Sequence, residues 1–402
     1  MAATTPTPRT TPAHGTPTGP RSRGEVESQG YSCTVLEGFF EDSDFVRELR
    51  QLAATAADKN IFYEPSTLLP ARRYLAGEDK WRMVLIHQRQ RGHDESKRLV
   101  GFFPFVQLHS DWGISQWSLW KHPYCFLTLP LVESGHEEPV FECLFRSLKT
   151  NSLGPALLHF PLLPGDGPVH RAFVAVKRRL LLTSFIRDEF LRAIIRIPDD
   201  ADEYLRDTLS GHHLREYRRQ RRKLEEHGQL EYRAWSKGQP LHSWIDWFLE
   251  LEASGWKGEK QTAMSCDQSH TQYFQEMASL AAENHQLRMD GLFLDGSPIA
   301  LSCSLVSPPV SFGFKIAFDE QFKKFSPGTQ LELERMSRGK DETISMSDSC
   351  AVPDHPMINR LWKERRIIRE VTVSTGKILG ELALGTIPLI RTGYRLFRRS
   401  KS

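Results

Sequence analysis

The sequence has 402 residues, of which 39% are hydrophobic and 26% are charged, with a formal net charge of +3. This length suits two compact domains, and the composition excludes a wholly disordered or fibrous chain. Residues 1–24 and 391–402 contain cations and no acids, so the rest of the protein is mildly acidic. This charge distribution argues against a protein whose whole body binds nucleic acid.

The cysteines and the apolar runs exclude further classes of protein. The six cysteines lie far apart, without the spacing of a zinc module or a disulfide scaffold, so no metal is expected. No secretory signal is visible, and no apolar run reaches the ~18 residues that a spanning helix needs. We therefore expect a cytoplasmic protein. The segment 375–402 is apolar with a basic end, and it is expected either to lie on the inner membrane as a peripheral contact or to pack on the body as a C-terminal helix.

In chain order, residues 1–30 come first, and they are predicted to form a disordered arm because they are rich in Pro and Thr with little apolar content. The pattern becomes globular at Tyr31. Alternating short strands and helices then predict a layered α/β (α+β) domain over residues 31–198. Its expected helices are 39–57, 140–149 and 169–177, and its expected strands are 81–87, 98–107, 117–120, 124–131 and 156–160.

A second series of elements starts near Asp199 and predicts a second domain over residues 199–374. The dipeptide Asp295-Gly296 is a strong turn signal, so the runs on either side are expected to pair as a hairpin. The expected helices are 202–228, 241–252, 271–284 and 329–338, and the expected strands are 286–295, 297–306, 310–318 and 343–347. Both halves share a rough order of helix, hairpin, strand and helix, which favours two copies of one fold.

The start of the predicted helix after strand 310–318 is a candidate anion site. Thr329 and Glu332 fit a capping box, and Gly328 permits close approach of a ligand to the backbone. The free N–H groups of a helix start can cradle a phosphate or pyrophosphate. The alternative is an ordinary helix start without a ligand.

The predicted helix 202–228 carries a cluster of arginines. Arg218 and Arg222 lie one turn apart, as do Arg215 and Arg219, and guanidinium groups suit phosphate or carboxylate ligands. The helix is therefore either a substrate-binding face or a solvated one. Because no aromatic platform interleaves with the arginines, no nucleic-acid partner is expected.

Other polar residues stand at positions that suggest chemistry. Trp256 and Lys257 lie in a glycine-flanked turn, where they either line a substrate pocket or cap the core. Lys315 interrupts an apolar strand, where an ionisable side chain needs a partner or a role. Asp319 and Asp348 follow strands, and His355 in the next loop is a candidate general base.

Together these segments resemble the CelD-like acetyltransferases of the GNAT superfamily, bacterial proteins associated with cellulose or other exopolysaccharide production. The resemblance is specific from about Ser210 to Trp362, and the stretch from Leu119 to Val132 is also similar to that family's N-terminal half. The motifs that carry it are the basic helix from Ser210 to Gly228, Trp256-Lys257-Gly258, Phe314-Lys315-Ile-Ala-Phe-Asp319-Glu320 and Phe325-Ser-Pro-Gly328.

The resemblance implies tandem GNAT-like mixed sheets flanked by helices, in a Fem-like two-domain arrangement, and acetyl-CoA or another acyl-CoA as the donor. In GNAT proteins the loop before the corresponding helix binds the CoA pyrophosphate. Here that loop has a single glycine preceded by Lys323 and Lys324, whereas the usual pattern is Arg/Gln-x-x-Gly-x-Gly/Ala. The implied donor-binding residues are Phe325, Ser326, Pro327, Gly328 and Thr329.

The implied activity is N- or O-acyl transfer to a sugar, lipid or peptide acceptor. Asp319, Asp348 and His355 are then the candidate bases, with Lys315 as an electrostatic partner. Two alternatives stay open. One is a non-catalytic accessory protein of a membrane polysaccharide synthase, and the other is a Fem-like aminoacyltransferase.

Overall fold

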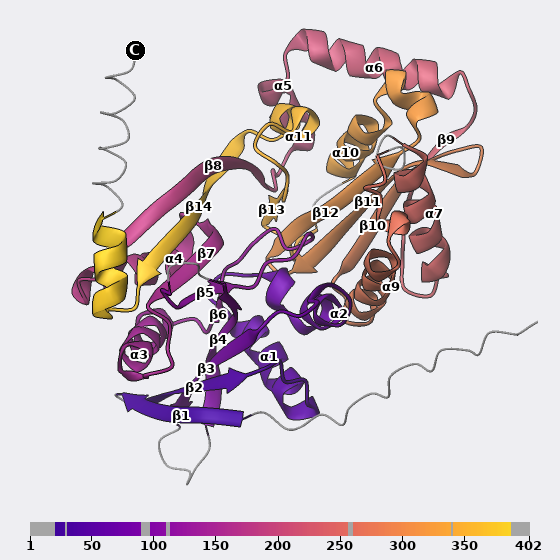
Figure 1. Cartoon of the computed structure of the whole chain (residues 1–402). Coiled ribbons are helices and arrows are strands. Elements are labelled where there is room, and N and C mark those ends of the chain that lie inside the picture. Colours follow the sequence, from indigo (N-terminus) through magenta and orange to yellow (C-terminus); the bar gives the residue numbers. More distant parts are fainter. Residues whose placement is uncertain are drawn as a thin grey trace, which may run out of the picture.

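The computed structural model describes residues 21–28, 30–89, 97–109, 113–255, 260–338 and 341–386, and of residues 21–28 only the backbone. The first half alternates strands and helices (Figure 1). Its strands are β1 (Arg21–Ser28), β2 (Tyr31–Glu37), β3 (Trp81–Arg89), β4 (Lys97–Leu108), β5 (Gln116–Leu119), β6 (Leu131–Val132), β7 (Leu157–Pro164) and β8 (Ser184–Arg196). Its helices are α1 (Ser43–Thr55), α2 (Pro65–Leu75), α3 (Glu137–Thr150) and α4 (Gly167–Arg179), with the 3-10 turn η1 (Ile61–Tyr63).

The second half begins with two helices and continues in the same alternating manner. Its helices are α5 (Ala201–Thr208), α6 (Gly211–Glu225), α7 (Leu241–Ser254), α9 (Gln268–Glu283), α10 (Pro327–Ser337) and α11 (Pro356–Leu361), with 3-10 turns η2 (Met264–Cys266) and η3 (Glu320–Phe325). Its strands are β9 (Leu230–Ala234), β10 (Leu287–Leu294), β11 (Ser297–Ser307), β12 (Val310–Phe318), β13 (Met346–Asp348) and β14 (Glu364–Ser374). Residues 378–386 form a last helical segment.

In the described part of the chain, the strands form one mixed sheet in the order β1-β2-β3-β4-β5-β7-β14-β8-β13-β12-β11-β10-β9, with β6 beside β4. Each half contains three antiparallel strands followed by a parallel neighbour: β3-β4-β5 with β7, and β10-β11-β12 with β13. This repeat confirms the expected tandem mixed α/β architecture.

The two halves exchange a strand. The strand that follows β7 in sequence is β8, yet β7 pairs with β14, while β8 pairs with β13. Strands β8 and β14 then pair with each other along ten register positions and join the halves. A division of the chain at residues 198/199 therefore does not divide the sheet into two halves, because β14 follows this point in sequence and yet lies between β7 and β8 in the sheet.

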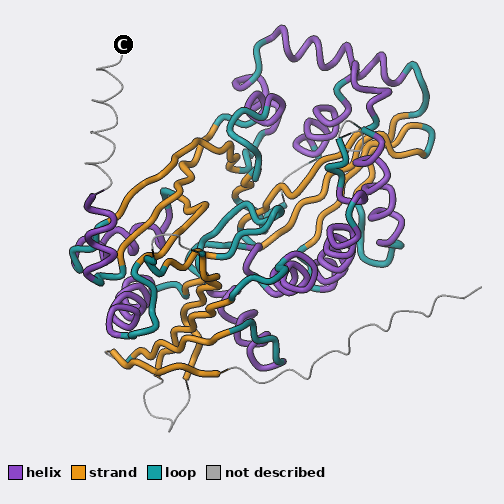
Figure 2. Tube along the Cα trace, viewed as in Figure 1, coloured by secondary structure: helices purple, strands orange, loops and turns teal. Residues whose placement is uncertain are grey.

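Helices cover both faces of the second half's strands (Figure 2). On one face, Leu224 of α6 and Leu331 of α10 pack with Ile316 of β12. On the other face, Phe248 of α7 and Phe274 of α9 pack with the main core, which continues into the first half. The β12 strand is therefore buried between two apolar layers.

Three expectations about local structure were wrong. Residues 21–28 form β1, antiparallel to β2, and do not belong to an arm. The predicted helix 202–228 is two helices: α5 ends at Thr208, and Ser210 caps the start of α6, where its side-chain oxygen accepts a hydrogen bond from the His213 N–H (3.3 Å). Residues 124–130 form no strand, and this segment packs on the second half.

Candidate active site

The strands β12 and β13 separate after a short parallel ladder. Strand β12 pairs with β11 along its whole length, whereas it pairs with β13 only at Val310–Phe312. At Gly313 the neighbouring chain is still close, since an added Cβ would lie 2.9 Å from the Ser349 carbonyl oxygen. Beyond that point, no strand of the described residues pairs with this edge of β12. The second half of β12 therefore borders a gap in the sheet.

A β-bulge in β12 sets the direction of Lys315. Cys303 of β11 pairs with Lys315 and Ser304 pairs with Gly313, so Phe314 is an extra residue in the strand. The bulge reverses the alternation of side chains. Phe312, Phe314 and Ala317 consequently lie in the main core on the α7 and α9 face, and Ile316 lies on the α6 and α10 face. Lys315 is thereby directed toward α7, as its contacts show.

The ammonium group of Lys315 is held by residues from both halves of the chain. It forms an ion pair with Glu252 of α7, whose side chain is 1% exposed. It also lies 5.1 Å from the centre of the Tyr124 ring, which comes from the first half. The other carboxylate oxygen of Glu252 accepts the backbone N–H of Met264 at 2.8 Å. Lys315 is thus a positioned cation close to the gap.

Tyr124 and His270 form a polar pair beside this cation. The Tyr124 hydroxyl lies 3.0 Å from Nδ1 of His270, which is half-buried in the first turn of α9. The Tyr124 ring also stacks on Tyr273 with centroids 5.3 Å apart. Burial raises the pKa of Tyr124, and the negative charge of Glu252 raises it further, so the phenol stays protonated at neutral pH.

Tyr124, Glu252 and His270 were not expected as site residues from the sequence. One signal for Glu252 was available, because it follows Ile245 and Phe248 at helical spacing on the apolar face of α7. An acid at a core-facing position requires a buried partner. Tyr124 and His270 give no comparable signal, since only the packing of the two halves brings them together.

The first turn of α10 lies at the far end of β12. Ser326 adopts the left-handed conformation (φ 53°), and Pro327 and Gly328 then begin the helix. An added Cβ at Gly328 would lie 3.3 Å from Cδ1 of Ile316, so the helix start packs closely on the strand. The expected capping box is absent: the helix begins two residues before Thr329, and Glu332 pairs with Arg335.

The N-terminal N–H groups of α10 and nearby cations suit a phosphate. Gly328 and Thr329 belong to the first turn, whose amides have no partner within the helix, and no acid stands in this turn. Of the two lysines that precede it, Lys323 pairs with Glu320 at 3.1 Å, and Lys324 lies over the Phe325 ring. The anion site at Phe325–Thr329 stays a prediction.

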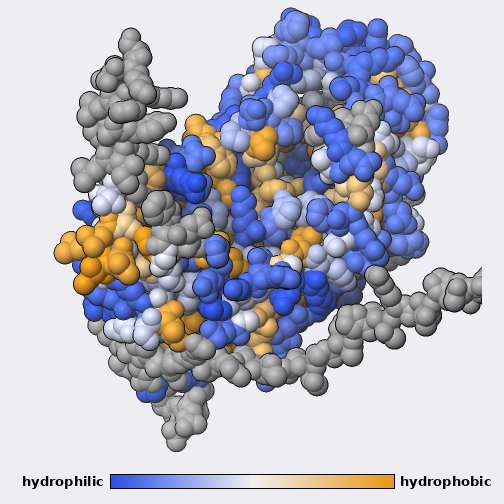
Figure 3. Space-filling view, viewed as in Figure 1, coloured by the Kyte–Doolittle hydropathy of each residue, from blue (hydrophilic) through white to orange (hydrophobic). Residues whose placement is uncertain are grey.

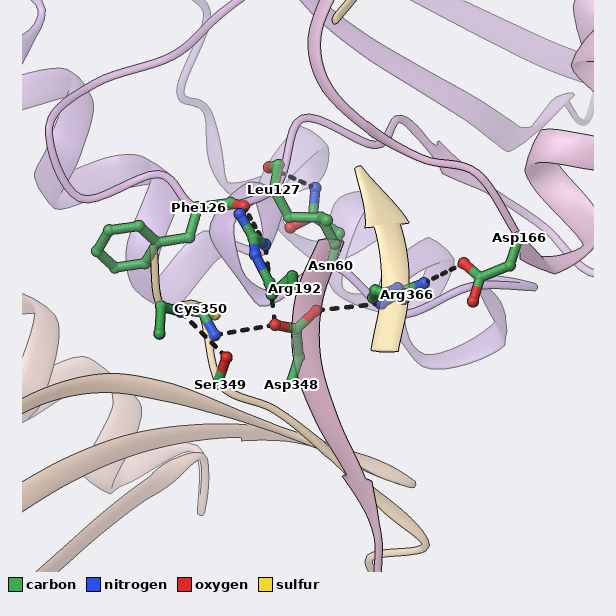
Figure 4. Close-up of polar contacts among 10 residues, drawn as sticks. Asn60, Phe126, Leu127, Asp166, Arg192, Asp348, Ser349, Cys350 and Arg366 are labelled. Atoms are coloured by element: carbon green, nitrogen blue, oxygen red, sulfur yellow. Dashed lines mark hydrogen bonds and ion pairs between the residues drawn. The ribbon is translucent and has the colours of Figure 1, made fainter. Parts of the chain in front are cut away.

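Asp348 is the centre of a buried charge cluster (Figure 4). It is 1% exposed, and its Oδ2 accepts a hydrogen bond from Arg366 at 3.2 Å, while its Oδ1 lies 3.8 Å from Arg192. Arg366 also donates to Asp166 at 2.7 Å, and Arg192 donates to the Phe126 carbonyl at 2.7 Å. These contacts join β13, β14 and β8 to the first half, so they favour a structural role for Asp348 over the predicted role of base.

The other two candidate bases cap helical turns. The Asp319 carboxylate accepts the Gln321 N–H at 2.9 Å at the start of η3. Nδ1 of His355 accepts the Ile358 N–H at 3.3 Å at the start of α11. Each group thus has a local structural role, and the polar pair that adjoins Lys315 is Tyr124 with His270.

The arginines of α6 line a groove of about 910 Å³ between α5, α6 and α10. Arg218 and Arg222 are exposed there, and within the described residues they form no ion pair, in contrast to Arg221, which pairs with Glu225 and Glu334. Gln330 in the first turns of α10 also lines the groove. The predicted substrate residues Trp256 and Lys257 lie outside the described residues.

The described residues contain no group of His, Cys, Asp and Glu that could hold a metal ion. Within these same ranges, every helix is too short or too polar to cross a membrane.

Comparison with known proteins identifies the second half. Residues 211–354 match the family model described as "Acetyltransferase (GNAT) domain". This match runs from α6 through the segment after β13 and includes Lys315 and Phe325–Thr329. No curated protein matches the chain.

Solved structures are similar in fold at low sequence identity. FemX superimposes with a TM-score of 0.55 at 9% identity, over 84% of this chain and 96% of FemX. A conserved protein of unknown function from Bacteroides thetaiotaomicron gives a TM-score of 0.50 at 10% identity, over 84% and 98% of the two chains. The chain thus shares its overall fold with FemX. Residues 211–354 within it are similar to GNAT acetyltransferase domains.

Proposed function

We propose that the protein moves an acyl group from acyl-CoA to a hydroxyl or amine of an acceptor, as the CelD-like acetyltransferases that it resembles are expected to do. The observation that carries this proposal is the gap beside β12. The gap begins where the ladder between β12 and β13 ends, and α10 begins near the C-terminal end of β12. The family match over residues 211–354 covers β12, α10 and β13.

In this proposal the donor spans the gap and the groove. Phe325–Thr329 hold its pyrophosphate through the first amides of α10. Gln330 is two residues beyond Gly328, about 3 Å along the helix axis, and it lines the arginine groove. Arg218 and Arg222 are thus placed to bind a further phosphate of the donor.

Lys315 and the Tyr124–His270 pair supply the remaining chemistry. The acceptor nitrogen or oxygen bonds to the thioester carbonyl carbon, and the C–S bond breaks to release the CoA thiolate. Lys315 stabilises the negative charge that develops on the carbonyl oxygen. The acceptor proton passes to the Tyr124 oxygen while the phenol proton moves to Nδ1 of His270. The thiolate then recovers a proton from the imidazolium or from water.

The acceptor enters from the side of the first half, because Tyr124 belongs to that half and contacts Lys315. We propose a sugar, lipid or peptide acceptor, with exopolysaccharide or cellulose biosynthesis as the setting. An acetyl group is the simplest donor group to test. Asp319 and His355 become second choices as bases, since both cap helices.

A second candidate is aminoacyl transfer from an aminoacyl-tRNA, as the Fem-like resemblance suggests. The observation that favours it is the exposure of Arg218 and Arg222 on α6, which form no ion pair within the described ranges and suit a polyanion. In that case tRNA binds and free CoA does not. Absence of binding to either donor would favour the accessory role.

Calorimetric titration of acetyl-CoA and free CoA tests the first candidate. Gly328 is a poor site for a variant because its Cβ position is crowded, whereas Asp and Asn tolerate the left-handed conformation of Ser326. Ser326→Asp places a negative charge at the helix start, which suits the helix but repels a phosphate. We expect Ser326→Asp to lose binding and the neutral control Ser326→Asn to keep it. Equal binding by both variants would refute the assignment of the donor site.

A further inference from the structure

Five large apolar side chains are exposed together at one end of the molecule. Ile378, Leu379 and Leu382 of the last helical segment are 78%, 64% and 60% exposed, and Leu181 and Ile186 are 86% and 47% exposed. We name these five residues the apolar patch. Figure 3 shows a hydrophobic area at this end of the molecule, on the left of the view.

The two segments of the apolar patch are in direct contact. The Thr183 N–H donates to the Glu381 carboxylate at 3.2 Å, and the Ser374 N–H donates to the Thr183 carbonyl at 2.9 Å. An added Cβ at Gly376 would lie 3.2 Å from Cδ2 of Leu182. The loop before β8 and the helical segment 378–386 therefore form one continuous surface.

The helical segment already has a buried apolar face elsewhere. Leu384 is 3% exposed and packs against Ala156 and Leu157. Ile378, Leu379 and Leu382 point away from this contact, so the helix is apolar on two sides and only one side is covered. A surface with several large exposed apolar side chains is typical of an interaction site.

Charges around the patch favour an anionic partner. Lys149 and Arg178 are exposed, and within the described residues neither forms an ion pair, whereas the nearby Glu138 and Glu142 are paired with Arg179. Lys149 lies against Gly376. The chain continues from the patch into residues 387–402, which include Ile387, Leu389, Ile390, Leu396 and Phe397 with four arginines, one lysine and no acid.

We propose that the apolar patch, bordered by Lys149 and Arg178, docks the protein on an anionic phospholipid bilayer. A cationic segment gains less by folding back over a patch that Lys149 and Arg178 border than by meeting anionic headgroups. A second copy of the same surface would bring the same cations together. Apolar side chains combined with several cations are the two signals that stable interfacial binding needs.

Vesicle flotation of the full-length protein tests the proposal. Phosphatidylcholine vesicles with and without phosphatidylglycerol are compared for the wild type, for Leu181→Ser/Leu379→Ser, and for the control Val352→Ser, whose side chain is 61% exposed in the segment after β13. We expect binding only to the anionic vesicles, and a loss of roughly tenfold in partitioning for each patch leucine removed. Val352→Ser should bind as the wild type does.

A third full-length variant, Arg395→Glu/Arg398→Glu/Arg399→Glu, measures the electrostatic part, about fivefold per cation near the surface. Far-UV circular dichroism verifies that the variants are folded. The proposal is overturned if the wild type stays unbound, or if Leu181→Ser/Leu379→Ser floats like the wild type. It is also overturned if that variant converts a dimer into a monomer on a sizing column, because the patch would then be a contact between copies.

Discussion

Replacement of Lys315 by methionine separates the catalytic role that we propose for it from its structural role. Lys315→Met leaves Glu252, which is 1% exposed, without the cation that it contacts. Removal of one member of a buried ion pair costs about 3–5 kcal/mol, and we expect about 3 kcal/mol here because Glu252 keeps its hydrogen bond from the Met264 N–H. If Lys315 also stabilises the developing oxyanion, turnover falls about 100- to 1000-fold.

The double variant Lys315→Met/Glu252→Gln removes both charges. Because no unpaired charge then remains buried, the free energy of unfolding should return to within about 1 kcal/mol of the wild type. Turnover should stay low, because the cation is still missing. Glu252→Gln alone should lose less stability than Lys315→Met, since the Lys315 side chain retains 15% exposure to water.

Urea denaturation gives the stability of the four proteins. Release of thiol from acetyl-CoA, with water as the acceptor of the acetyl group, gives a turnover that needs no identified substrate. All four must bind acetyl-CoA for the comparison to hold, which calorimetry verifies. Recovery of turnover in the double variant would refute the catalytic role and leave Lys315 as a structural partner of Glu252. If the double variant lost as much stability as the two single variants together, the two side chains would not be energetically coupled.

Three further predictions concern residues outside the reaction centre. Burial lowers the pKa of His122 to about 3. In the unfolded chain this histidine takes up a proton near pH 6.5, so lowering the pH from 7 to 5 should lower the free energy of unfolding by about 2 kcal/mol. His122→Leu should remove this part of the acid sensitivity in urea denaturation at the two pH values, and an unchanged pH dependence would contradict it. Arg218→Ala/Arg222→Ala should weaken acetyl-CoA binding about tenfold and leave 3′-dephospho-CoA binding unchanged; calorimetry showing equal loss for both ligands would argue against a contact with the 3′-phosphate. Asp348→Asn should lower the free energy of unfolding by about 3 kcal/mol in urea, and a change below 1 kcal/mol would show that the cluster in Figure 4 contributes little.

The sequence predicted the elements whose signals are local. The hairpin through Asp295-Gly296 became β10 and β11, and the apolar run 310–318 became β12. A helix follows β12 as expected, although α10 begins at Pro327 and uses no capping box, and the anion site at its start stays a prediction. These features depend on turn residues and apolar runs, which can be recognised within about ten residues of sequence.

The elements that were missed depend on long-range contacts. Strands β8 and β14 each contain several charged residues, and no run of apolar residues marks them. Their central position in the sheet is possible because Arg192 of β8 and Arg366 of β14 share the Asp348 carboxylate. A buried arginine in a central strand is stable only with its partner, and that partner stands far away in sequence.

The direction of the Lys315 side chain also could not be predicted from the sequence. Strict alternation would place Phe312, Phe314 and Ile316 on one face of β12 and Lys315 on the other. The bulge at Phe314 changes this, and it is set by the register with β11. A single extra residue therefore decides that the cation faces Glu252 and the first half of the chain.

The two halves repeat one topology, but their parallel strand pairs differ. In the first half β5 pairs with β7 at Gln116–Ser118, and beyond that point the Thr128 N–H donates to the Leu162 carbonyl, so residues 120–130 fill the position of the gap. The helix that follows, α3, has Glu137 and Glu138 in its first turn, which disfavours a phosphate there.

The segment that fills the gap in the first half also reaches the second. Residues 120–130 place the Tyr124 ring beside Lys315 and the Phe126 carbonyl on Arg192. One half thus keeps an open strand edge and a helix start free of acids, while the other has closed its own gap and contributes a side chain across the interface. If this division is correct, the second half cannot complete the reaction centre alone, because Tyr124 is missing from it.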